Sequence, residues 1–177
     1  MFKKLRGFTL IELLIVVAII GILAALLIPN AITAIQKAKQ KATMKDIAVI
    51  SAAITDYITD NGVAMAQSGV YTAASPFYAD LSPFYIKVLP INDQWGNGYR
   101  VYTGTDIAVY GVAGIADDFL VASYGRDRLE NVDGFAFLTT APEAGLYIVN
   151  EMVHFNRDLV MWNGSWIRAP KAGGTGT

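Results

Sequence analysis

The stretch RGFTLIELLIVVAIIGILAALLIPNA, residues 6–31, is almost wholly apolar from Phe8 to Ile28, yet it carries one carboxylate, Glu12, near its beginning. The length of this run fits the roughly 20 apolar residues with which a helix spans the hydrocarbon core of a bilayer. A lone carboxylate at the centre of such a helix costs about 2.5–3.5 kcal/mol on insertion, and less near one end. The sequence therefore predicts a membrane-length helix in which Glu12 needs an explanation.

A cleaved secretory signal is the main competing interpretation, because MFKKLR is a basic start before an apolar run. Signal peptides usually have an apolar region of about 7–15 residues that is followed by a small-residue cleavage site. Here the run is longer and leads through LIPNAITAIQ into further helical pattern, which favours a membrane anchor. Orientation stays open on charge alone, because basic residues flank the run on both sides.

Glu12 has no lysine, arginine or histidine within a helical turn or two inside the apolar run. Its carboxylate could reach the headgroups, be protonated, or find its partner on another chain. A free α-amine would be such a partner, and a cut just before Phe8 would create one. A buried charge is tolerated when an opposite charge compensates it, so a partner on another chain would explain why Glu12 lies in the apolar run.

The residues RGFTLIE resemble the cleavage and methylation motif of type IV pilins and type II secretion pseudopilins. The short basic leader MFKKLRG matches the leader type of that family. The resemblance implies that a prepilin peptidase cuts after Gly7 and methylates the new N-terminal Phe8. It also implies that Glu12 accepts the charge of the Phe8 amine on a neighbouring subunit, so that an inner-membrane assembly platform can build a filament from this and other pilin-like subunits.

The resemblance also sets the expected order of domains and their compartments. We expect a prepilin leader at 1–7, a transmembrane and polymerisation helix at 8–28, an amphipathic helix at 29–60, an α+β head at 61–170 and a flexible tail at 171–177. The leader would be cytoplasmic and the head periplasmic. The subunit would sit in inner-membrane lipid before assembly and in a periplasmic or extracellular filament afterwards.

Gly21 and Pro29 lie within the predicted helix. Proline removes one backbone hydrogen bond and clashes with the preceding turn, so Pro29 predicts a kink or local unwinding. A plain helix break at the membrane exit explains the same proline. The resemblance implies a third possibility, a segment between Gly21 and Pro29 that melts in the filament and makes the helix compliant.

Beyond Pro29 the apolar residues keep spacings near three and four, and Gly62 is a plausible helix end. A basic patch lies on this second half of the helix. A solvated face explains such a run, and anionic lipid or acidic groups on adjacent subunits are the alternatives. No nucleic-acid partner is expected, because the net charge is -1 and no aromatic residues interleave with the lysines. The patch consists of Lys37, Lys39, Lys41 and Lys45.

The head is expected to be a connecting region followed by a sheet. Residues 61–92 predict a connection with one short helix around Ala79–Tyr85. Strands are predicted from the runs YRVYTG, IAVYGVAG, DFLVASYG, GFAFLTT, GLYIVN and DLVMWNGSWIRA, with a hairpin at Asn-Gly in WNGSW. The predicted class is α+β, a long N-terminal helix packed on an antiparallel sheet, which the resemblance identifies as the type IV pilin fold.

The segment INDQWGNGYRVY resembles an element that precedes the sheet in major pseudopilins, through Asp93, Trp95, Gly96 and Tyr99. We expect Trp95 and Tyr99 to seal the core between helix and sheet, and Gly96 to permit a tight turn. This element favours a type II secretion pseudopilin over a type IV pilin. The lack of cysteine favours it too, since many pilins close their C-terminal loop with a disulfide.

DDFLVASYGRDRLENVDG and HFNRDLVMWNGSW resemble the C-terminal loop of the same family, which implies one structural calcium. Calcium takes 6–8 oxygen ligands, and loops rich in carboxylates suit it. The spacing is not that of an EF-hand, and turn-forming residues explain the same letters. The candidate side chains are Asp127, Asn131, Asp133 and Asp158.

The sequence contains few residues or motifs that are typical of enzyme active sites. The chain has one histidine and no cysteine, and no phosphate-binding glycine motif, nucleophile elbow or zinc spacing appears. We therefore expect no enzyme and no required cofactor, but a subunit of the type II secretion pseudopilus that drives protein export across the outer membrane. The alternative is a type IV pilin that forms a surface fibre for adhesion, motility or DNA uptake. A binding head on a membrane anchor is a third class, and it would need no Glu12.

Overall fold

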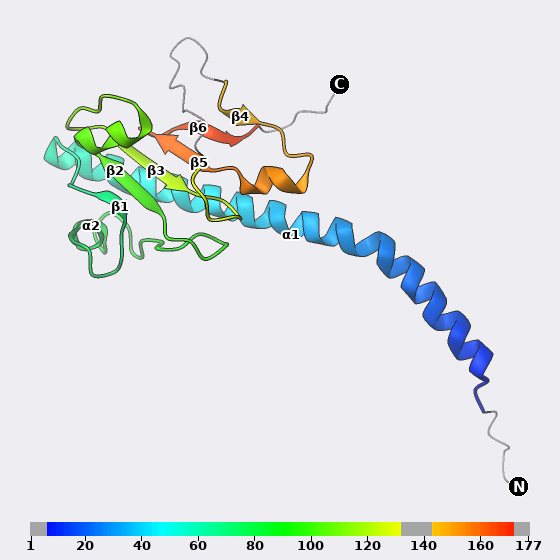
Figure 1. Cartoon of the computed structure of the whole chain (residues 1–177). Helices are drawn as coiled ribbons and strands as arrows, with labels where there is room; N and C mark the ends of the chain where they lie inside the picture. The colour runs from blue at the N-terminus through cyan, green and yellow to red at the C-terminus, as the bar shows by residue number, and fades with distance from the viewer. Residues whose placement is uncertain (1–6, 132–142, 172–177) are drawn as a thin grey trace, which may run out of the picture. The chain divides into compact units, whose positions relative to one another are not determined.

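The computed structural model describes residues 7–131 and 143–171 of the 177-residue chain (Figure 1). Its longest element is the helix α1, Leu10–Asn61, which confirms the single long helix predicted from the apolar spacing. Gly62 follows with a φ of 78°, and its N–H donates to Ile58 O at 2.7 Å. This left-handed glycine ends the helix.

The chain divides into two units, residues 1–37 and 38–177, and α1 contributes to both. Within the described residues, α1 is the one helix that is long and apolar enough to cross a membrane by length and composition. Gly21 and Pro29 both lie inside it in helical conformation, and Thr33 Oγ1 donates to Pro29 O at 3.0 Å. The isolated chain therefore does not unwind at Pro29, and the melted segment stays a prediction for the filament.

The second unit contains a sheet that has six strands within the described residues, in the order β1-β2-β3-β5-β6-β4. Neighbouring strands are antiparallel, except that β4 runs parallel to β6. The predicted α+β fold is confirmed, with a mixed and mostly antiparallel sheet. The strands are β1 Ser68–Val70, β2 Arg100–Thr103, β3 Phe119–Ser123, β4 Leu146–Tyr147, β5 Leu159–Trp162 and β6 Ser165–Pro170.

The hairpin between β5 and β6 turns at Asn163 and Gly164, as the Asn-Gly pair predicts. Both residues have positive φ, 46° and 80°, which a tight two-residue hairpin turn requires. The Asn163 side chain donates to Asp118 Oδ1 at 2.6 Å and accepts the Phe119 N–H at 2.9 Å. The turn is thus tied to the beginning of β3.

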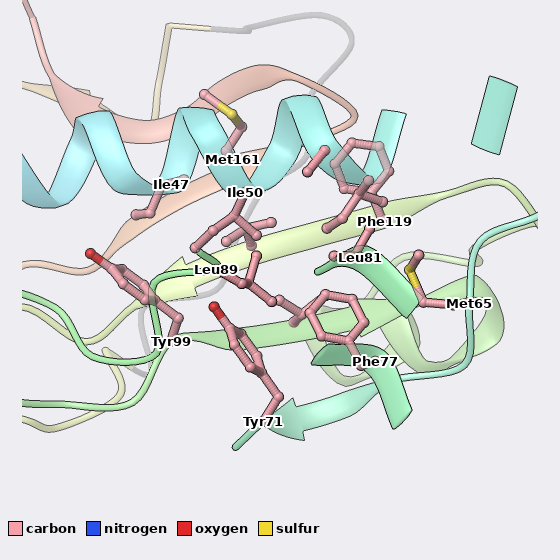
Figure 2. Close-up of a cluster of buried hydrophobic side chains, with 14 of the residues drawn as sticks. Ile47, Ile50, Met65, Tyr71, Phe77, Leu81, Leu89, Tyr99, Phe119 and Met161 are labelled. Atoms are coloured by element: carbon pink, nitrogen blue, oxygen red, sulfur yellow. The ribbon is translucent and has the colours of Figure 1, made fainter. Parts of the chain in front are cut away.

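The core lies between α1 and one face of the sheet (Figure 2). Ile47, Ile50 and Ile54 of α1 are fully buried, and they pack on residues that alternate along the strands. On the sheet these residues are Val101, Phe119, Val121, Leu159 and Met161. The intervening residues Leu120, Ala122 and Val160 form a second cluster with Ile107 and Tyr110 on the opposite face.

The run IAVYGVAG was predicted to be a strand, and this is wrong. Its first half lies in the 3₁₀-helix η1, Gly104–Tyr110. Ile107 and Tyr110 are its buried residues, three positions apart. Side chains three apart lie above one another in a 3₁₀-helix, so this spacing buries both apolar groups on one side. Alternation was therefore the wrong period for this run.

The short helix α2 spans Pro76–Leu81, and the predicted bounds Ala79–Tyr85 were wrong. Pro76 occupies the first turn, where a missing N–H costs nothing. Pro83 disfavours helical conformation at the residue before it, and the helix ends before Ser82. Strand β1 lies in the predicted connecting region, GLYIVN forms only the two-residue β4, and GFAFLTT lies outside the described residues.

Replacing Ile50 by Ala should lower the free energy of unfolding by about 2–5 kcal/mol, because the side chain is fully buried and leaves a cavity. Val49→Ala is the matched control. Val49 is next to Ile50 in the sequence, but its side chain is 40% exposed, so its loss should change the free energy of unfolding by no more than about 0.5 kcal/mol. Denaturant unfolding measures both. Equal losses for the two variants would contradict the assigned core.

Candidate functional site

Glu12 lies in a capping box at the beginning of α1. The backbone N–H and the hydroxyl of Thr9 both donate to Glu12 Oε2, at 2.8 and 2.7 Å, and Glu12 N–H donates to Thr9 Oγ1 at 3.3 Å. These bonds satisfy backbone donors that the first turn of a helix leaves unpaired. Glu12 thus has partners in its own chain, which the sequence analysis missed although Thr-x-x-Glu before an apolar run is the signal for them.

The predicted cleavage point lies just outside this helix. Gly7 and Phe8 precede Leu10, the first helical residue, and Phe8 is 78% exposed. The predicted cleavage point between Gly7 and Phe8 therefore lies outside α1. Both Thr9 bonds use Oε2 of Glu12, and no bond to its Oε1 occurs within the described residues. The free oxygen is open to an outside donor.

Asp93 organises the turn that was predicted from INDQWGNGY. Its Oδ1 accepts the N–H groups of Trp95 and Asn97, both at 2.9 Å. Its Oδ2 accepts Asn97 Nδ2 at 3.1 Å and Ser123 Oγ at 2.7 Å. Gly96 has a φ of 85°, which confirms its role in a tight turn. The buried Asp93 carboxylate therefore links this loop to the end of β3.

The two aromatic residues of this element behave differently. Tyr99 is fully buried in the core and donates its hydroxyl to Asp46 Oδ2 at 3.0 Å. Burial and the nearby Asp46 carboxylate raise the pKa of Tyr99, so the hydroxyl stays protonated and can donate. The prediction for Trp95 is wrong: it is half-buried and outside the core cluster, because the turn organised by Asp93 holds it elsewhere.

The calcium candidates are brought together in part. Asp158 is fully buried, its Oδ2 accepts the Asn131 N–H at 2.9 Å, and its own N–H donates to Asn131 Oδ1 at 3.1 Å. Asp127 Oδ1 instead accepts the Leu129 N–H at 3.1 Å in a local turn. Asp133 lies outside the described residues. Asp158 Oδ1 is buried without a hydrogen-bond partner within the described part of the chain.

The Asp158 carboxyl is buried and is influenced by charges of both signs. Burial raises the pKa of its carboxyl to about 6, and the carboxylates of Asp127 and Glu130 also raise it. The Asn131 N–H and the Arg168 guanidinium act in the opposite direction. The sequence analysis did not single out Glu130 or Arg168. In the described residues no group of three or more acidic, cysteine or histidine side chains could hold a metal, so the calcium site stays a prediction.

Comparisons with known proteins agree with the N-terminal site. Residues 2–28 match the family described as "Prokaryotic N-terminal methylation motif". The type II secretion system core protein G of Vibrio cholerae serotype O1 is 32% identical over 131 residues, which are 71% of this chain and 85% of that protein. The chain belongs to the family of type II secretion system core protein G. It is a pilin-like subunit, and the predicted likeness to a major pseudopilin is confirmed.

Other core protein G sequences match over shorter lengths. That of Pseudomonas aeruginosa is 38% identical over 105 residues, 55% of this chain and 73% of that protein. That of Klebsiella pneumoniae is 36% identical over 59 residues, 33% of this chain and 42% of that protein. No solved structure matches this chain. The core protein G family is one of structural subunits rather than enzymes.

Gly125 holds the loop that carries the calcium candidates against the 3₁₀-helix η2, Met152–Asn156. Its φ is 66°, and a Cβ there would lie 2.7 Å from Arg157 O and 3.0 Å from Phe155 O. Arg126 N–H donates to the same Phe155 O at 2.9 Å. The loop and η2 are therefore in close backbone contact, with no space for a side chain at Gly125.

Replacing Gly125 by Ala should lower the free energy of unfolding by more than the about 1–2 kcal/mol that the left-handed conformation alone costs a residue with a Cβ. Gly62→Ala is the matched control, because its φ of 78° imposes the same conformational cost but its Cβ would meet open space. Thermal unfolding compares the two. A smaller loss at position 125 than at position 62 would contradict the close packing of this loop.

Proposed function

We propose that this chain is a structural, non-catalytic subunit that polymerises through its N-terminal helix into the type II secretion pseudopilus, the filament that drives protein export across the outer membrane. Membership of the core protein G family and the methylation motif at residues 2–28 support the proposal. One observation carries it: Glu12 lies four residues after Phe8, and one of its carboxylate oxygens has no hydrogen-bond partner within the described residues.

Processing would create a positively charged partner for Glu12, in addition to its hydrogen bonds from Thr9. A prepilin peptidase would cut after Gly7 and methylate the Phe8 nitrogen, leaving a secondary amine that is cationic at neutral pH. Before assembly the helix would span the inner membrane with its N-terminus in the cytoplasm and the head in the periplasm. Hydrogen bonds from Thr9 would then reduce the cost of holding the Glu12 carboxylate near lipid.

Assembly would exchange lipid for protein around α1. An inner-membrane assembly platform would bring the helix against those of other pilin-like subunits. Oε1 of Glu12 would accept the Phe8 amine of a neighbour while Oε2 keeps its Thr9 bonds. A compensated pair is far cheaper to bury than either charge alone, so the pair favours the register that joins the two groups.

Replacing Glu12 by Ala or Gln should leave processing and membrane insertion intact but reduce filament yield to background, because the Phe8 amine of the neighbour loses its counter-charge. Glu143→Gln is the matched control, since it removes a carboxylate from an exposed ion pair with Lys171. Immunoblots of processed subunit and electron microscopy of filaments measure both steps. Normal filament yield from either Glu12 variant would contradict the proposal.

We also propose that the loop around Asp158 holds one structural calcium. The unpartnered Oδ1 of Asp158 and the side-chain oxygen of Asn131 support this, together with the carboxylates of Asp127 and Glu130. A divalent cation would pair with the buried Asp158 carboxylate, and calcium favours oxygen ligands. Asp133 is a further candidate ligand from outside the described residues.

Chelator should lower the melting temperature of the detergent-solubilised chain, and added calcium should restore it, because a ligand bound to the folded state stabilises it. Asp158→Asn should abolish both responses by removing the buried charged ligand. Magnesium at the same concentration serves as the control for general ionic effects. An unchanged melting temperature in chelator would remove the calcium proposal.

A further inference from the structure

The surface of α1 that points away from the sheet has opposite charges at its two ends. In the second unit, Lys41 and Lys45 lie toward the beginning of this surface, and Asp56 and Asp60 lie toward its end; all four are exposed. The spacing of these residues keeps them on one side of a helix with 3.6 residues per turn. We define the outer α1 face as Lys41, Lys45, Ala48, Ala52, Asp56 and Asp60.

These charges are unfavourable within the chain itself. Lys41 and Lys45 form a like-charge pair four residues apart, and so do Asp56 and Asp60. Asp60 lies in the last turn of α1, which contains no basic residue, and a negative charge there opposes the helix dipole. Folding of α1 alone gives no reason for this arrangement.

The charges are also largely unpaired. Within the described residues, Lys41, Lys45 and Asp56 take part in no ion pair, whereas Asp60 Oδ2 accepts the Tyr85 hydroxyl at 3.1 Å. A solvated surface tolerates such charges, but it does not sort them by sign. The separation into a basic end and an acidic end points to a partner surface with acidic groups opposite the lysines and basic groups opposite the aspartates.

A groove runs along one edge of the outer α1 face, where the helix meets the β5–β6 hairpin. It has a volume of about 290 Å³ and lies between α1 and the β5–β6 turn, lined by Ala48, Ala52, Asp56, Met161 and Gly164 among others. Small side chains on α1 and a glycine on the turn allow another chain to approach closely. All six residues of the outer α1 face are exposed, and Figure 1 shows the cyan part of α1 on which they lie.

We propose that the outer α1 face binds a second copy of this chain, with the Lys41 and Lys45 end of one copy against the Asp56 and Asp60 end of the next. The inference rests on the proposed filament, in which all copies point the same way along the filament axis. A copy displaced along the filament axis brings its basic end to its neighbour's acidic end. Charge complementarity then selects the displaced arrangement and disfavours unshifted packing, where like charges meet.

A lipid surface is the competing occupant for the lysines. Anionic headgroups would attract Lys41 and Lys45, but they would repel Asp56 and Asp60 on the same face. They would also leave unexplained the groove beside Asp56. A second copy accounts for both ends and for the groove with one interaction.

Charge reversal in the full-length chain tests the interface. Lys41→Glu with Lys45→Glu should lower filament yield about tenfold or more, and so should Asp56→Lys with Asp60→Lys, because each change places like charges together. The fourfold variant exchanges the two ends and should restore yield to within about twofold of the unaltered chain. Each reversal keeps two like charges four residues apart, so the repulsion between them within α1 does not increase.

Control variants separate the possible failures. Asp80→Lys with Lys87→Glu reverses two exposed charges away from the outer α1 face, with no change in net charge, as in the fourfold variant, and should leave yield unchanged. If the unaltered chain forms no filament, the proposed function fails. If it does, and Glu12→Ala abolishes assembly, then a normal yield from either charge-reversed pair overturns only this inference. A fourfold variant as impaired as the pairs also overturns it.

Salt dependence of the unaltered chain is a second measurement that needs no variant to fold. At about 1 M salt the screening length falls to about 3 Å, so attraction between exposed charges is largely lost. Filament yield from detergent-solubilised subunits should fall several-fold relative to about 0.1 M salt. An unchanged yield across this range would overturn the charge-paired interface.

Discussion

The compensation of one carboxylate, Glu12, is the constraint on which the N-terminal half of this protein depends. The surrounding helix is apolar enough to enter a membrane, and a carboxylate there is costly unless other groups satisfy it. In the isolated chain Thr9 supplies hydrogen bonds to one carboxylate oxygen and leaves the other free. In the proposed filament, processing at Phe8 would supply a cationic partner for the other oxygen.

The head depends on the same helix in a different way. Ile47, Ile50 and Ile54 bury one side of α1 against the sheet, while the other side carries the separated charges of the outer α1 face. Folding and assembly therefore use opposite sides of one element. A substitution can then weaken one without the other, because residues on opposite sides share no contacts and their effects on free energy add.

Sequence patterns predicted best where one physical cause dominates. The isoleucine spacing of α1 and the Asn163–Gly164 turn are both present, because burial and backbone conformation leave few alternatives there. Prediction failed where tertiary contacts decide. Ile107 and Tyr110 look like part of a strand but pack in a 3₁₀-helix beneath the second face of the sheet.

The candidate sites show the same division. Gly7, Phe8 and Glu12 lie within one short stretch of sequence, so they could be singled out from the local pattern, and the family match covers that stretch at residues 2–28. The environment of Asp158 was predicted only in part, because its burial and the approach of Arg168 from β6 depend on how the sheet packs. Asp93 accepts local hydrogen bonds from Trp95 and Asn97, whereas its bond from Ser123 of β3 depends on tertiary packing.

The most direct test of the central claim is the structure of the assembled filament by cryo-electron microscopy. The decisive quantity is the distance between the Glu12 carboxylate and the Phe8 nitrogen of the neighbouring subunit. Our account predicts an ion pair, with nitrogen and oxygen within about 4 Å. A filament in which every Glu12 faces lipid or solvent, with the Phe8 amines paired elsewhere, would contradict it.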